Sequence, residues 1–220
     1  MRLNSPATSD DATRHQLLEA AGAVFAETGF RAATVREICR RAGANIAAVN
    51  YHFGDKETLY AEVLSHSQAK ALEKHPPLLD VSPDAPPEKR LHAFVLSLLL
   101  RIFDKGPTAW HGKLMAREMI EPTAALDSLV EERIRPMAEQ LRKIIGEILD
   151  CPPNDERVLL CGFSVVSQCM FYHHCQPVIL RLAPKQAFDP AGIARLAEHI
   201  ARFSLAALNN LPEAKTTKTK

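Results

Sequence analysis

The sequence predicts an all-α fold, and three observations support this prediction. Apolar residues recur with the 3.6-residue period of amphipathic helices along the whole chain, whereas the alternation of a half-buried strand is missing. Capping residues and Gly or Pro turns separate these periodic segments. With 220 residues, 46% of them apolar and 24% charged, the chain has the composition of a globular protein that buries a core.

Four helices are expected in the first third of the chain. The apolar stripe of the first helix ends at a Gly, and a Thr followed three residues later by a Glu forms a capping box for a short second helix. A Gly turn leads to a capped third helix, and a fourth extends towards His75. The residues that set these boundaries are Gly29, Thr34, Glu37, Gly43, Asn45 and Asp55.

A Pro-rich stretch from His75 to Pro87 marks a boundary, because its five prolines exclude a helix interior. Beyond it, the periodicity predicts helices at about 88–104, 109–120, 123–149, 155–174 and 190–208. Pro136 is expected to kink the third of these helices. We expect residues 1–10 and 212–220 to be disordered.

The net charge of +1 does not show the excess of Lys and Arg that is common in DNA-binding domains. Residues 1–75 contain nine Lys and Arg against nine Asp and Glu. No apolar run reaches the roughly 18 residues of a membrane span, and the first ten residues lack the apolar centre of a secretory leader. We therefore expect a cytoplasmic protein without a membrane partner, whose five cysteines are reduced thiols.

The spacing of the second and third helices is that of a helix-turn-helix, in which the second helix of the pair enters the major groove. At 100° per residue, Ile46, Val49 and Phe53 share one buried stripe, and Tyr51 lies roughly opposite. Small side chains on the outer face allow close approach to base edges, and the start of the fourth helix suits a phosphate. The predicted contacts to a double-stranded operator are Thr34, Arg36, Asn45, Ala47, Ala48, Asn50, Tyr51, His52 and Lys56.

Residues 13–64 resemble the DNA-binding domain of TetR-type repressors, most specifically in Tyr51-His52-Phe53 followed by Lys56-Glu57 and Leu59. Asn50 departs from the tyrosine of many members, so the base preference is not carried over. The segments 117–119, 122–126 and 134–136 are similar to the CecR-like branch. The resemblance implies a helix-turn-helix domain at 11–56, a connecting helix at 57–75, and a ligand-binding and dimerisation domain at 88–210. It also implies a homodimer on a palindromic operator, released by a small-molecule effector.

Methionine and aromatic side chains in the C-terminal half suit an adaptable pocket for an apolar or aromatic effector, although ordinary core packing explains the same spacing. The candidate effector residues are Phe103, Trp110, Leu114, Met115, Arg117, Glu118 and Met119. The resemblance further implies that the last two long helices pair with those of a second chain, the alternative being an internal core. The candidate interface residues are Phe163, Ser167, Met170, Leu196, Ile200, Phe203 and Ala207.

Cys169, His173 and Cys175 leave an alternative open, a DNA-binding regulator that senses a metal or thiol oxidation. No CxxC pair or second ligand cluster accompanies them, so structural roles are favoured. No nucleophile with its base has a recognisable spacing, so we expect no catalytic residues. We also expect no cofactor and no bound metal. The sequence thus predicts a transcriptional repressor that responds to a ligand.

Overall fold

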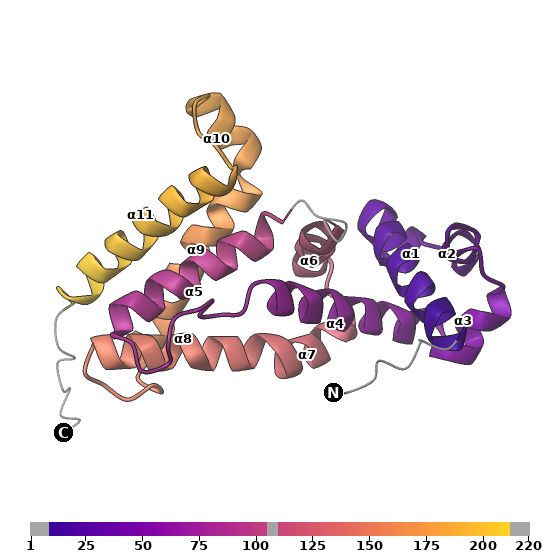
Figure 1. Cartoon of the computed structure of the whole chain (residues 1–220), viewed down its shortest axis with the longest axis horizontal. Coiled ribbons are helices and arrows are strands. Elements are labelled where there is room, and N and C mark those ends of the chain that lie inside the picture. The colour runs from indigo at the N-terminus through magenta and orange to yellow at the C-terminus, as the bar shows by residue number, and fades with distance from the viewer. Residues whose placement is uncertain (1–8, 105–109, 212–220) are drawn as a thin grey trace, which may run out of the picture. The chain divides into compact units, whose positions relative to one another are not determined.

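The computed structural model describes residues 9–104 and 110–211, and every regular element within them is helical (Figure 1). The all-α prediction is confirmed. The described part of the chain forms two compact units, Met1–Lys74 with Asp104–Pro136 and His75–Phe103 with Met137–Lys220. The helices are α1 (Ser9–Ala32), α2 (Val35–Ala42), α3 (Ile46–Phe53), α4 (Lys56–Lys74), α5 (Pro87–Ile102), α6 (Trp110–Ile120), α7 (Ala125–Leu129), a π-helical turn (Val130–Ile134), α8 (Arg135–Ile148), α9 (Glu156–His174), α10 (Gln176–Leu182) and α11 (Pro190–Leu208).

The first unit contains the predicted four-helix head together with α6 and α7. Helix α1 packs against α2, α3, α4 and α6, so it lies at the centre of this unit. Its break falls at Gly29, whose φ of 82° lies in a region that side chains rarely adopt. Fully buried side chains from four helices meet in the core, among them Phe25, Ile38, Leu59 and Leu114.

The second unit is built around α5, α9 and α11, which pack against one another. Its core contains Leu91, Leu99, Ile145 and Ile200, all fully buried. An ion pair between Arg90 on α5 and Glu147 on α8 links these two helices.

The structure departs from the expected elements at three places. The predicted helix at 123–149 is interrupted by the π-helical turn, which ends two residues before Pro136, where the missing N–H and the ring of the proline disturb the α-helical ladder. Helix α10 was not predicted. Ser9 and Asp10 already belong to α1, whereas the rest of 1–10 and all of 212–220 lie outside the described residues.

The division into units also differs from the predicted domains, because α6 and α7 belong with the head rather than with the C-terminal helices. Their apolar side chains, including Leu114 and Leu129, are buried in the core of the first unit. In the described ranges, no single helix has the length and hydropathy to cross a membrane; α9 and α10 meet that criterion only as a pair, bent by 75°.

Candidate DNA interface

The turn between α2 and α3 is held by the caps that the sequence predicts. Thr34 accepts a hydrogen bond from the Glu37 amide at 3.2 Å, and Gly43 ends α2 in the left-handed region with φ of 65°. The side chain of Asn45 then accepts from the Ala47 amide at 3.0 Å and starts α3. Thr34 and Asn45 are both exposed while they cap their helices.

Helix α3 presents an outer face of Ala47, Asn50 and Tyr51, whereas Val49 and Phe53 are buried. Tyr51 is 76% exposed. Ile46 was placed on the buried stripe but is 49% exposed, because it is the first residue of α3 and precedes the part of the helix that packs on the core. The outer face is therefore small except for one aromatic ring, as a helix that enters the major groove requires.

Ala48 and His52 turn away from this face. Ala48 is half-buried against the core of the head, and the His52 side chain is only 7% exposed, with its Nε2 atom 3.6 Å from a carboxylate oxygen of Asp10. These two residues have less surface to offer DNA than their position on a helical wheel indicates.

Lys56 lies at the start of α4, but its ammonium forms hydrogen bonds within the head. Its Nζ donates to the carbonyl oxygens of Phe30 at 3.0 Å and Ala33 at 3.2 Å, and it lies 4.6 Å from the centre of the Phe30 ring. The ammonium thus satisfies one carbonyl in the last turn of α1 and one just beyond its end. One of its three N–H groups remains for a phosphate.

The arginines of α2 divide into two kinds. Arg40 and Arg41 both bind the Glu37 carboxylate, and Arg41 also binds Glu27. The hydrogen bonds from Arg40 and Arg41 lower the pKa of Glu37 to about 2. Arg36 is exposed at the start of α2, and its contact with a phosphate stays a prediction.

Comparison with known proteins decides the family. The model described as "Bacterial regulatory proteins, tetR family" matches residues 17–63, and that of the C-terminal domain of "HTH-type transcriptional dual regulator CecR" matches residues 87–208, more than half of the chain. The chain belongs to the TetR family. TetR-family proteins regulate transcription by binding DNA and are not enzymes, in agreement with the predicted lack of a catalytic site.

Individual relatives agree with this assignment. A Shigella flexneri protein named HTH-type transcriptional dual regulator CecR is 29% identical over 85% of this chain and 88% of its own. The HTH-type transcriptional repressor NicS of Pseudomonas putida is 32% identical over 80% and 85%. The fold is also similar to that of PfmR, a TetR-family regulator from Thermus thermophilus, with a TM-score of 0.62 at 22% identity over 87% of this chain and 95% of that one.

In this TetR-family chain, α6 packs directly against the DNA-binding head. The indole of Trp110 lies against α1 so closely that a Cβ atom built on Gly22 would be 2.5 Å from it. Arg117 donates to the carbonyl oxygens of Ala26 at 3.0 Å and Glu27 at 2.9 Å, which lie just before the break in α1. A movement of α6 therefore has to move α1 or break these contacts.

Glu118 is the polar centre of the contact between α6 and α4. Its side chain is fully buried, and it accepts hydrogen bonds from the Tyr60 hydroxyl at 2.6 Å and from the amide and hydroxyl of Thr123. Burial, together with this hydrogen bond, raises the pKa of Tyr60 well above its ordinary value. The carboxylate is thus already satisfied by the chain itself.

The seven candidate effector residues do not share one environment. Phe103 belongs to the second unit, where it stacks on Phe188 with ring centres 5.0 Å apart. The other six lie on α6: Trp110 and Leu114 are buried and Met119 is 47% exposed. Two surface depressions, one lined by residues between Lys143 and Pro153 and one by residues between Arg195 and Phe203, contain none of the seven.

The candidate dimer residues also differ in how far they are buried. Leu196 and Ile200 are buried in the core of their own unit, which favours the internal alternative for these two positions. Phe163 on α9 and Phe203 on α11 are 62% and 60% exposed. Met170 is half-buried, whereas Ser167 and Ala207 are exposed.

In the C-terminal unit, burial raises the pKa of the thiols of Cys151, Cys161 and Cys169. Burial raises the pKa of Cys169 to about 12, so this thiol is protonated at neutral pH. Cys169, His173 and Cys175 do not form a group with metal-binding spacing. In the described part of the chain, such a group consists instead of His15, Glu19 and His66, which the sequence analysis did not single out.

Proposed function

We propose that this regulator is a homodimeric repressor whose α3 helices read the two halves of a palindromic operator, and that a small apolar or aromatic effector releases it. The observation that carries the DNA contact is the outer face of α3, where Ala47, Asn50 and an exposed Tyr51 stand on a helix fixed by a capped turn. Alanine lets the backbone approach the bases, and asparagine and tyrosine supply groups that hydrogen-bond base edges or phosphates.

We infer that the protein represses transcription rather than activating it. One relative is named a repressor and another a dual regulator, so relatives of this chain include both modes. A protein that occupies an operator through two recognition helices acts most simply by blocking that DNA.

Two exposed phenylalanines support the dimer. Phe163 and Phe203 lie on α9 and α11, which pack against each other, and Leu160 adds a third apolar side chain that is 56% exposed. Large apolar side chains that stay exposed on two packed helices indicate an interaction surface. Pairing this face with its copy would form a four-helix interface and hold two heads at the spacing of about 34–36 Å that successive major grooves require.

Control by a ligand is supported by the contacts of α6. Because Trp110 and Arg117 both hold α1, an effector that displaces α6 changes the position of the head that carries α3. We propose that the effector binds at Trp110, Leu114, Met115 and the neighbouring polar groups.

The experiment that tests the DNA-binding part is enrichment of genomic fragments by the purified protein, followed by sequencing. We expect an inverted repeat, bound by two chains in a fluorescence anisotropy titration at fixed salt. Phe163→Asp with Phe203→Asp should produce monomers in sedimentation and weaken operator binding. Enrichment without an inverted repeat, or a double variant that is still dimeric, would contradict the proposal.

A further inference from the structure

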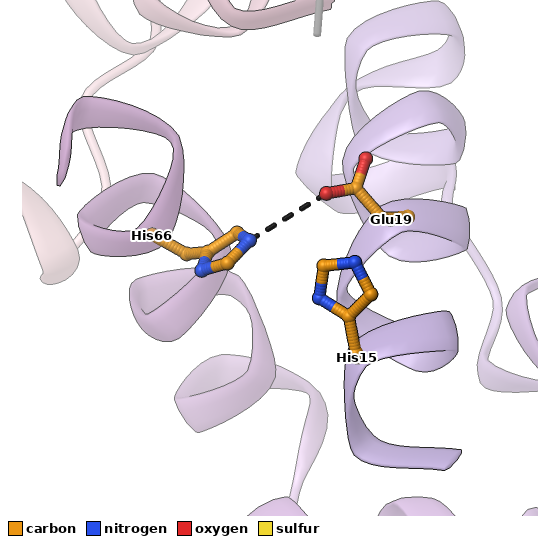
Figure 2. A group of neighbouring side chains, drawn as sticks. All are labelled: His15, Glu19 and His66. Carbon is orange, nitrogen blue, oxygen red and sulfur yellow. Dashed lines mark ion pairs between the residues drawn. The ribbon is translucent and has the colours of Figure 1, made fainter. Parts of the chain in front are cut away.

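Two histidines and a glutamate converge between the first helix of the head and the connecting helix (Figure 2). His15 and Glu19 stand one turn apart on α1, and His66 reaches towards them from α4. One ligand atom from each lies within 4.8 Å of those of the other two. The rings of His15 and His66 meet edge to face with their centres 5.7 Å apart.

His66 is not satisfied by the residues around it. Its Nε2 atom is buried and has no hydrogen-bond partner among the described residues, although it lies 3.5 Å from a carboxylate oxygen of Glu19. A buried ring nitrogen without a partner is unusual in a folded protein. The Nε2 atom of His66 is therefore available to a cation.

We propose that His15, Glu19 and His66 bind a zinc ion that joins α1 to α4. Two imidazoles and one carboxylate form a donor set that zinc uses in proteins, with water in the fourth position. Ligands at about 2.0–2.2 Å in a tetrahedral site are themselves roughly 3.4 Å apart, so the three groups have to close by on the order of 1 Å. Side-chain rotation is sufficient, because His15 is exposed and Glu19 only half-buried.

Lys70 competes with the ion. Its ammonium forms an ion pair with Glu19 Oε1, one turn along α4 from His66. The Lys70 side chain is 33% exposed and can swing into solvent. Zinc then takes the place of the ammonium beside the Glu19 carboxylate.

The ion would connect the two ends of the head. Helix α1 begins the head, and α4 leaves it directly after α3. Zinc therefore favours the arrangement of α1 and α4 in which the three ligands meet, and above its dissociation constant it should stabilise the protein by an amount that grows with the logarithm of its concentration.

The test uses tag-free, full-length protein that has been stripped with a chelator. We expect about one equivalent of zinc per chain in calorimetry and a zinc-dependent rise in melting temperature. His66→Ala and His15→Ala should each weaken binding by at least about 100-fold, since even changes outside the ligand shell cost 10- to 100-fold. Lys70→Met should tighten it. His92→Ala is the matched control, because His92 also lies beside a glutamate, 3.4 Å from Glu198, and it should bind zinc like the wild type.

Cobalt distinguishes this site from the cysteines. Bound at His15, Glu19 and His66, it should give d–d absorption without a thiolate charge-transfer band, whereas a site at Cys169 or Cys175 would give that band. A thiolate band, or an unchanged zinc response in His66→Ala, would overturn the proposal. DNA binding by the chelator-treated protein is measured in parallel, and it tests the proposed function independently of the metal.

Discussion

Tyr51 is the more exposed of the two large exposed apolar side chains of α3, the other being Ile46. We expect Tyr51→Ala to weaken operator binding by the equivalent of about 1–3 kcal/mol, the cost of losing a good base contact. The melting temperature should hardly change, because this side chain is 76% exposed. Anisotropy titrations with operator and with a scrambled duplex measure the effect.

The matched control for Tyr51 is Arg36→Ala, which removes a predicted phosphate contact. It should weaken binding to both duplexes alike and reduce the salt slope by about one. Equal losses on operator and scrambled DNA for Tyr51→Ala would show that the tyrosine contacts only the backbone. Lys56→Ala is a poorer probe, because it also removes two hydrogen bonds inside the head.

Arg101 is a buried cation without an acidic partner among the described residues. It is 4% exposed, its Nε donates to the Ser97 carbonyl at 3.3 Å, and its Nη2 atom has no partner. Burial lowers its pKa to about 10, so it remains charged at neutral pH. Since an uncompensated buried charge is costly, Arg101→Met should raise the free energy of unfolding by roughly 1–4 kcal/mol.

Chemical denaturation measures this difference, with Arg202→Met as the control on the exposed face of α11. That change should stay within about 0.5 kcal/mol. A destabilised Arg101→Met protein would mean that the guanidinium has an anionic partner in solution.

At the scale of elements, Gly22 shows how closely α6 packs against α1. In an exposed helix, replacing Gly by Ala stabilises by about 1 kcal/mol, but here the new methyl group would lie 2.5 Å from the Trp110 ring. Gly22→Ala should therefore destabilise the protein and shift the fluorescence of its single tryptophan. Trp110→Ala in the same chain should remove most of the additional loss, because the two sites are coupled.

Gly162→Ala is the control, since the nearest side-chain atoms to its added methyl group are 3.8 Å away, an ordinary contact. It should be neutral or stabilising. If Gly22→Ala were as stable as Gly162→Ala, the close packing of α6 on α1 would be wrong.

The head could be predicted from the sequence because its signals are local. Thr34, Asn45 and Gly43 set their boundaries through contacts a few residues away, and each occurs as predicted. The position of α6 could not be predicted in this way. The apolar period of Trp110 and Leu114 shows that one face of the helix is buried, but it does not show which helix that face packs against. For the same reason, the partners of Lys56 and the meeting of His15 with His66 arise only from packing between distant segments.

At the scale of the whole molecule, control of DNA binding requires the effector and the operator to favour different conformations. We expect operator DNA to weaken effector binding by the same factor by which the effector weakens DNA binding, typically about 5- to 150-fold. A thermal-shift screen of apolar and aromatic compounds provides the ligand. Quenching of Trp110 then measures its affinity with operator, with scrambled DNA and without DNA.

Arg117 gives this linkage a structural test. Arg117→Met keeps an apolar stem but removes both hydrogen bonds from α6 to the Ala26 and Glu27 carbonyls. If α6 transmits the signal, this variant should keep its effector affinity in the absence of DNA and lose much of the linkage factor, whereas Lys113→Met on the exposed side of the same helix should keep both. An effector whose affinity ignores the operator would rule out release by linkage. An effector that still raises the melting temperature after Trp110 and Met115 are both replaced by alanine would place its site elsewhere and leave α6 with a purely structural role.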